Sequence, residues 1–367
     1  MKSLLRLLLK SQHQRNRLES AQTEKGMTLI ELLVGSIMAF LIITPMLAFV
    51  VDMLNTDRRE QVKSNTEQDI QAAVDFIAQD LSQAIYIYDN RTLNGPPGPN
   101  EQQVRPQLPS PPPNTEGTPI LVFWKRQQLK NSLPINPSVA GTIKPKDCND
   151  NPGNCNDTYV LSLVAYYQIK DNNNPTWCQP AGNPCPTRIV RYEIRDGIDR
   201  VIDPSVPGGI TIYGDGGTIP AQRKDPAFNT RFNLNNPTVN VTDPAGLGNP
   251  QSGAQQPQVL VNYIDHSPYV PAPTGEECRI LLGFVPPAVT PAGTPAFAPD
   301  HLLITDRTST PTHSFYACVD TSKNIARVTI RGNSLRRIQT DANYAPNKSA
   351  YFPTASVQVQ GLGARGK

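Results

Sequence analysis

Glu31 is the residue whose position most constrains the chemistry of this chain. It closes the run Gly26-Met27-Thr28-Leu29-Ile30-Glu31 and is the only ionisable side chain between Met27 and Val51. A carboxylate in such an apolar run costs about 2.5–3.5 kcal/mol at the centre of a bilayer, and less near its interface. A carboxylate buried in such a run therefore needs a cation partner.

Six cysteines form a second group that can do chemistry. They fall after the apolar run, as the sequence pairs Cys148/Cys155, Cys178/Cys185 and Cys278/Cys318. An even count in an oxidising compartment favours disulfides, and we expect each cysteine to bond to the other member of its pair. On this expectation the first two bridges close short loops and the third links two strand regions. A thiolate zinc site is the alternative, but the Cys-x-x-Cys spacing it needs is absent.

Oxygen-bearing side chains surround the first cysteine pair. A calcium loop is one interpretation of Asp147, Asn149, Asn151 and Asp157. Against an EF-hand, Pro152 stands where the glycine belongs and Thr158 where the bidentate glutamate belongs. A disulfide-closed turn is the favoured interpretation, and we expect no cofactor.

Enzyme chemistry finds little support in the sequence. No His-Glu-x-x-His, serine elbow or phosphate-cradling glycine loop accompanies the four histidines, which are His13, His266, His301 and His313. Six aromatic residues could form a face that stacks on sugars, but aromatic residues in strands more often belong to a core. They are Trp124, Trp177, Tyr166, Tyr167, Tyr192 and Tyr263. We therefore expect a protein that is not an enzyme.

The residues around Glu31 predict a membrane-spanning helix. Residues 27–51 make about 37 Å of helix, which exceeds the ~30 Å of bilayer hydrocarbon. Residues 1–26 carry six basic and two acidic side chains, a net charge of +4, so the rest of the chain carries +3 − 4 = −1. The basic flank predicts a cytoplasmic N-terminus with everything after the span outside, and the residual charge argues against nucleic-acid binding.

This junction resembles that of type IV prepilins and of the pseudopilins of type II secretion. The resemblance implies that residues 1–26 are a leader, cleaved between Gly26 and Met27 by a prepilin peptidase in the cytoplasmic membrane. It also implies N-methylation of Met27, and pairing of Glu31 with the amine of a neighbouring subunit. Most family members have phenylalanine at the position of Met27, and the peptidase tolerates other apolar residues.

Beyond the span, assigned to residues 27–54, an amphipathic helix is expected over residues 55–90. Apolar residues from Ile70 to Ile85 recur at three- and four-residue spacing, as on a helix with one buried face. Pro45 predicts a kink or local unwinding near Ile42. The Pro- and Gly-rich residues 91–118 are predicted to be a linker.

Residues 119–367 are predicted to form an external β domain that carries the disulfides. Residues 203–257 have no apolar period and are expected to be a long loop. Strands are expected at Pro119–Trp124, Thr158–Ile169, Arg188–Arg195, Gln258–Ile264, Cys278–Val285, Ser314–Val319, Ile325–Arg331 and Ala355–Gln360. The expected fold class is α+β, a long N-terminal helix packed on an antiparallel sheet as in pilins.

Two further resemblances narrow the expected function. Arg58-Arg59 and Asp75-Phe76-Ile77-Ala78-Gln79-Asp80-Leu81 look like the large minor subunits of the J or W type. The Asn- and Pro-rich external domain is similar to pseudopilins of the hormogonium polysaccharide secretion system of filamentous cyanobacteria. Both imply a minor subunit of a hetero-oligomeric filament, assembled by an inner-membrane platform; a priming or adhesive tip subunit of a type IV pilus is the alternative.

Overall fold

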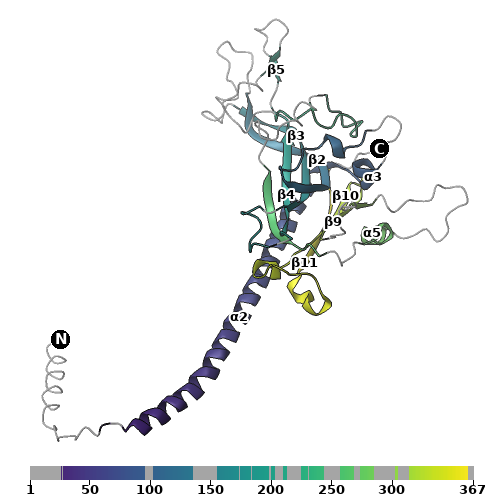
Figure 1. The fold of residues 1–367 in the computed structure, drawn as a ribbon. Coiled ribbons are helices and arrows are strands. Elements are labelled where there is room, and N and C mark those ends of the chain that lie inside the picture. Colours follow the sequence, from purple (N-terminus) through teal and green to yellow (C-terminus); the bar gives the residue numbers. More distant parts are fainter. Residues whose placement is uncertain are drawn as a thin grey trace, which may run out of the picture. The chain divides into compact units, whose positions relative to one another are not determined.

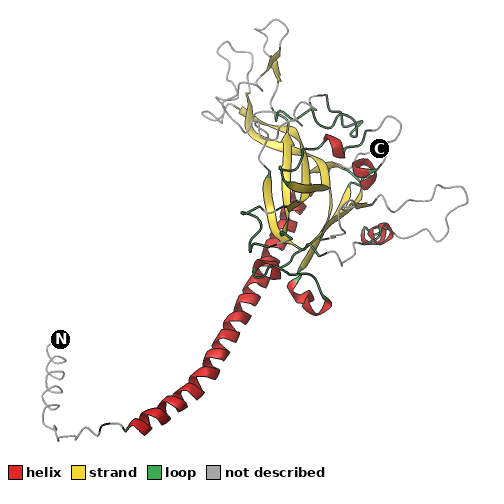
Figure 2. Cartoon of the chain, viewed as in Figure 1, coloured by secondary structure: helices red, strands yellow, loops and turns green. Residues whose placement is uncertain are grey.

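The computed structural model describes most of the chain after its first 25 residues. The described residues are 26, 28–95, 102–134, 155–172, 174–182, 184–197, 200–202, 210–212, 225–229, 231–243, 257–267, 273–284, 302–304 and 314–362. The chain divides into two compact units, Met1–Arg58 and Arg59–Lys367. The elements combine a long helix with antiparallel sheets, so the α+β class is confirmed (Figures 1 and 2).

Helix α2 is the longest element and spans Leu29–Ser82. Its first half is apolar and long enough to cross a membrane. The helix runs through Pro45 without interruption, so the local unwinding predicted near Ile42 to Pro45 does not occur, while the alternative, a kink, stays a prediction. Pro45 has no N–H to donate to the carbonyl of Leu41, while Thr44 adds a side-chain bond from its Oγ1 to the carbonyl of Phe40 at 2.8 Å.

Two antiparallel sheets dominate the second unit. The five-stranded sheet has the order β1-β2-β3-β4-β7, and the four-stranded sheet has the order β11-β10-β9-β8. The strands of the first are β1 (Ala84–Ile87), β2 (Thr115–Pro134), β3 (Cys155–Asp171), β4 (Thr187–Arg195) and β7 (Gln258–Ile264). Those of the second are β8 (Leu303–Ile304), β9 (Phe315–Asp320), β10 (Ile325–Arg331) and β11 (Thr354–Gln360). A separate hairpin pairs β5 (Arg200–Ile202) with β6 (Ile210–Ile212).

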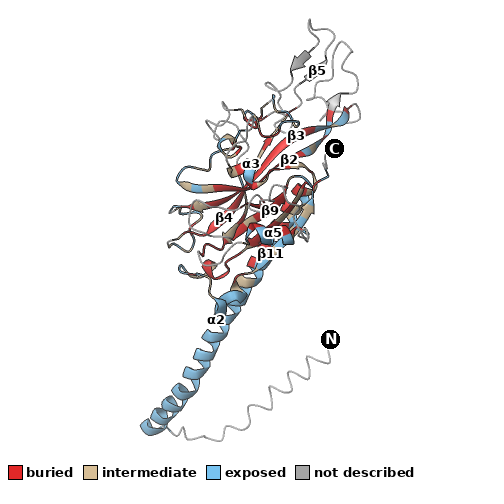
Figure 3. Cartoon of the chain, turned by 90° about the vertical axis from the view of Figure 1, so that its right-hand side faces the viewer, coloured by how far each residue is buried: buried red, intermediate tan, exposed pale blue. Residues whose placement is uncertain are grey.

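One hydrophobic core joins the end of α2 to both sheets. From α2 it takes Ile70, Ala73, Val74, Ile77 and Leu81, which confirms the helical spacing read from the sequence. Four aromatic side chains belong to this core: Trp124, Tyr166, Tyr167 and Tyr192. They are buried and so are not available to stack on a sugar. Figure 3 shows the change along α2 from exposed residues to buried ones.

The helix approaches the second sheet closely at Gly332. A Cβ on Gly332 would lie 2.2 Å from Cδ1 of Ile70 and 2.8 Å from Cγ2 of Thr66. A side chain at this position would require the side chains of Ile70 and Thr66 to shift.

The structure corrects the expected end of the helix and the extent of the linker. Helix α2 stops at Ser82, and residues 84–87 form strand β1 instead of continuing the helix to residue 90. Within residues 91–118, Leu93, Val104 and Leu108 are core residues. This segment also contains most of helix α3 (Asn90–Asn94) and the start of β2, so its described part belongs to the folded unit.

Cys278–Val285 was predicted to be a strand, and this prediction is wrong. Residues Gly275–Leu281 form helix α5, which begins with a capping box between Thr274 and Glu277. Gly283 follows with φ at +83°, as expected just past a helix end. The other predicted strands overlap observed ones; Gln258–Ile264 and Ile325–Arg331 match β7 and β10 end to end.

Candidate functional site

The predicted processing and assembly residues lie at the start of α2. Gly26 is exposed, and Met27 lies outside the described residues. Thr28 and Glu31 form a capping box: Thr28 N and Oγ1 donate to Glu31 Oε2 at 3.1 and 3.0 Å, and Glu31 N donates to Thr28 Oγ1 at 3.4 Å. Glu31 thus marks the first turn of the helix, where a carboxylate is also favoured by the helix dipole.

Sequence reasoning missed this capping box, although its signal was present. Thr-x-x-Glu ahead of an apolar run is a helix-start pattern in its own right. One carboxylate therefore has a local role in beginning α2, in addition to the intermolecular role expected from the resemblance.

The apolar half of α2 presents a continuous exposed surface. Eighteen large hydrophobic side chains from Leu29 to Leu54 are each exposed by 48% or more. Burial of apolar area stabilises by roughly 25 cal/mol per Å². An exposed apolar surface of this length therefore calls for a partner, either lipid or protein.

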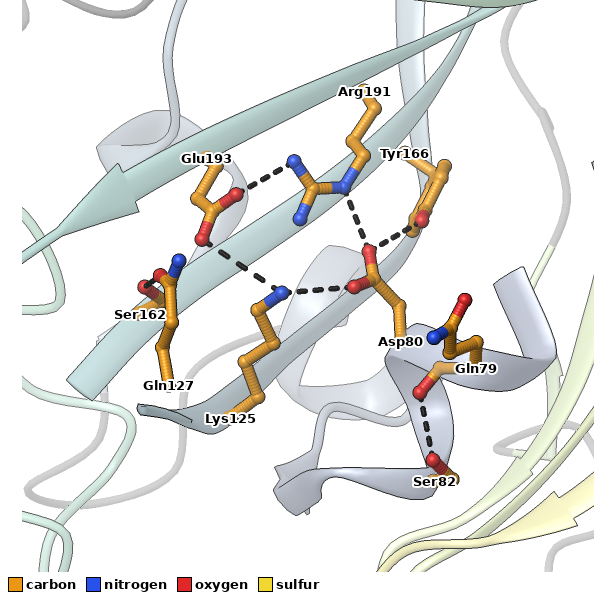
Figure 4. Close-up of polar contacts among 9 residues, drawn as sticks. All are labelled: Gln79, Asp80, Ser82, Lys125, Gln127, Ser162, Tyr166, Arg191 and Glu193. Atoms are coloured by element: carbon orange, nitrogen blue, oxygen red, sulfur yellow. Dashed lines mark hydrogen bonds and ion pairs between the residues drawn. The ribbon is translucent and has the colours of Figure 1, made fainter. Parts of the chain in front are cut away.

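A second cluster of charges sits where α2 ends against the five-stranded sheet (Figure 4). Asp80 on the last turn of α2 accepts from Lys125 of β2 at 2.8 Å, Tyr166 of β3 at 2.6 Å and Arg191 of β4 at 2.7 Å. Glu193 of β4 accepts from Nη1 of Arg191 at 2.7 Å and lies 3.7 Å from Nζ of Lys125. We call these five residues the Asp80 network.

The electrostatics of the Asp80 network favour an ionised Asp80 and a neutral Tyr166. Burial opposes ionisation of Asp80, but the hydrogen bonds and positive charges of Arg191 and Lys125 outweigh it and lower the pKa of the carboxyl. Burial, with the adjacent charge of Asp80, raises the pKa of Tyr166 well above its usual value. The two cations and two carboxylates of the network neutralise one another where they are buried. We therefore interpret the network as a contact that holds α2 to the five-stranded sheet, not as a substrate site.

The disulfides follow the predicted pairing where the structure describes them. Cys178–Cys185 and Cys278–Cys318 are formed. The second bridge joins helix α5 to strand β9, not two strand regions as expected. Cys155 is also disulfide-bonded, but the predicted pair involves Cys148, which lies outside the described residues.

Of the four residues considered for calcium, the structure describes Asp157 alone. Its carboxylate accepts from Nε2 of Gln128 and the backbone N of Asn131, both at 2.8 Å, across the β2–β3 hairpin. Asp147, Asn149 and Asn151 lie outside the described residues. Asp157 therefore has a structural role at this hairpin, which the calcium interpretation did not foresee.

Comparisons of this chain with protein-family models, with curated proteins and with solved structures find no match.

Proposed function

We propose that this chain is a minor pseudopilin, a membrane-anchored subunit of a periplasmic filament that assists export. The observation that best supports this proposal is the contrast between the two halves of α2. Its first half is apolar and exposed, with one carboxylate in its first turn, and its second half lies in the core of a β domain. A helix of this kind suits two successive environments, the bilayer and then the helical interior of a filament.

Maturation comes first in this account. A prepilin peptidase cuts between Gly26 and Met27, and the new Met27 amine is methylated. In the filament this amine, on a neighbouring subunit, supplies the cation that Glu31 needs once the helix has left the polar interface. Glu31 would exchange its bonds to Thr28 for this ion pair.

The contacts at the other end of α2 suit a helix that transmits a pulling force to the β domain. Extraction from the bilayer pulls on the helix, and the β domain must follow. Buried ion pairs from Asp80 and the close approach at Gly332 hold the helix to both sheets. The domain's 309 residues, Arg59–Lys367, would crowd a uniform fibre, which favours low stoichiometry or a tip position.

The partners in this proposal are other pilin-like subunits, the peptidase and an inner-membrane assembly platform. The described residues contain no cluster of histidine, cysteine, aspartate or glutamate that could hold a metal ion. Assembly, with export of a polymer such as polysaccharide, is the activity proposed, and no reaction is assigned to the chain.

Replacing Glu31 by alanine tests the proposal. We expect Glu31→Ala to be processed normally but to enter filaments about a hundredfold less or worse, because an unpartnered buried amine costs about 3–5 kcal/mol. Precursor and mature forms are compared by immunoblot of membranes, and incorporation is measured in sheared filaments.

Ser36→Ala is the matched control, since Ser36 lies in the same exposed apolar segment and bonds only to the carbonyl of Leu33 within its own helix. It should assemble like the parent chain. Wild-type incorporation of Glu31→Ala would contradict the proposed pairing.

A further inference from the structure

Strand β11 ends the four-stranded sheet as its outer strand. Its seven residues pair with β10 in unbroken antiparallel register, from Gln360 opposite Ile325 to Thr354 opposite Arg331. Among the described residues no other strand pairs with it. Its far side therefore presents a row of unpaired backbone N–H and C=O groups.

The other outer strands of the five- and four-stranded sheets are protected in ways that β11 is not. Strand β8 has two residues and β1 has four, while β7 has two register shifts and a left-handed residue, Tyr263, at φ 59°. Short strands and irregularities of this kind block edge pairing. Strand β11, Thr-Ala-Ser-Val-Gln-Val-Gln, is regular and has no charge, proline or glycine.

The apolar face of this sheet continues onto β11, where it is only partly covered. Ala355, Val357 and Val359 point to the core side and pack against it, yet each is only half-buried. Their partners across β10, Ile330, Val328 and Ala326, are fully buried. One more strand paired with β11 would bury these three side chains.

We propose that the free edge of β11 docks a β-strand from a neighbouring, different filament subunit, so that two sheets become one. This inference rests on the proposed function. The docking strand is uncharged, like the edge it meets, and carries small apolar residues at alternate positions to continue the row of Ala355, Val357 and Val359.

Geometry argues against a second copy of this chain as the occupant. Antiparallel pairing of two β11 strands needs a two-fold axis perpendicular to the sheet. Because residues Thr66 to Leu81 of α2 pack against the sheets, that axis would run this part of α2 in opposite directions in the two copies, which does not suit subunits of one filament. Parallel pairing would instead set the apolar row of one copy beside the polar row of the other.

The test compares lysine on the two faces of the same strand. In Val357→Lys the new ammonium reaches water in the free subunit, because Val357 is only half-buried, but docking would bury its charge. Ser356 is exposed, so Ser356→Lys is the matched control that keeps its charge in water. A photoreactive phenylalanine analogue at Gln358 reports the neighbour in filaments of the full mature chain.

We expect the parent and Ser356→Lys to crosslink to a strand of another subunit that itself begins with a cleaved pilin-like helix. Val357→Lys should lose about tenfold or more of this adduct. Its Cys278–Cys318 bridge and its proteolysis pattern should match the parent, which separates lost docking from misfolding.

Equal crosslinking of both lysine variants would overturn the inference, as would an adduct with a second copy or with no protein. If all variants reach filaments but none crosslinks, docking at β11 falls and the filament role stands. If even the parent chain fails to reach filaments, the proposed function falls as well.

Discussion

His266 is a titratable side chain that the fold buries at an energetic disadvantage. It is 8% exposed, and neither ring nitrogen has a hydrogen-bond partner in the described structure. Burial lowers the pKa of His266 below its usual value of 6.5. The charge of Asp265 opposes this shift, as Asp341 does, while the charges of Arg336 and Lys170 add to it.

A pH dependence of stability follows from this shift. Because the pKa of the folded state is the lower one, the unfolded chain binds more protons at mildly acidic pH. The contribution of His266 to the free energy of unfolding should be constant above pH 6.5 and fall as the pH drops from there through the folded-state pKa. Urea unfolding of the full chain in detergent, at pH 7.5 and at mildly acidic pH, measures this.

His266→Gln should remove that part of the decline, because glutamine does not titrate. Parallel declines in the parent and in His266→Gln would show that another group causes the effect. The carboxyl of Asp80, whose pKa is lowered from 3.8, contributes at more acidic pH, where its stabilisation is lost as the pH falls through the folded-state pKa.

At the scale of elements, the Asp80 network is the junction between α2 and the five-stranded sheet. Asp80→Asn keeps the shape but leaves Lys125 and Arg191 as buried cations with only Glu193 to balance them. Removing one partner of a buried ion pair costs about 3–5 kcal/mol, so the free energy of unfolding should fall by about that amount. Thermal or urea unfolding of the disulfide-bonded chain measures it.

Asp69→Asn is the matched control on the same helix. The side chain of Asp69 is 50% exposed and pairs with Arg337, and an exposed pair is worth about 0–1 kcal/mol. Similar losses for Asp80→Asn and Asp69→Asn would contradict a special role for the network.

The elements also show how far sequence could lead. Periodicity located the buried face of α2 and most strands because each pattern is local. Helix α5 had equally local signals, the Thr274-x-x-Glu277 box and Gly283, but its run of apolar residues was read as a strand. Short apolar runs are ambiguous between the two structures, and here the cap decides.

The Asp80 network was beyond prediction for a different reason. Asp80 is separated from Lys125 by 45 residues, from Tyr166 by 86 and from Arg191 by 111. Only the strand order brings these side chains together, and the same holds for the contact of Gly332 with Ile70. Strand β1 was missed because Ile85 fits the helical spacing equally well.

At the scale of the whole molecule, the chain combines two units with opposite requirements. The first unit exposes apolar side chains along α2, whereas the second encloses its own core and carries the described disulfides. Residues 27–367 alone have a net charge of −1, so the net positive charge of the full sequence comes from residues 1–26. These features together favour an anchored subunit that changes environment during assembly.

The most direct test of the central claim is the mass of the chain's N-terminal peptide, isolated from membranes of cells that make the protein. A C-terminally tagged chain is purified, digested and analysed by mass spectrometry. The account predicts a peptide that begins at Met27 with one methyl group on its amine, and a shift to the uncut form when Gly26 is replaced by a bulky residue. A chain that still begins at residue 1, or is cut elsewhere, would contradict it.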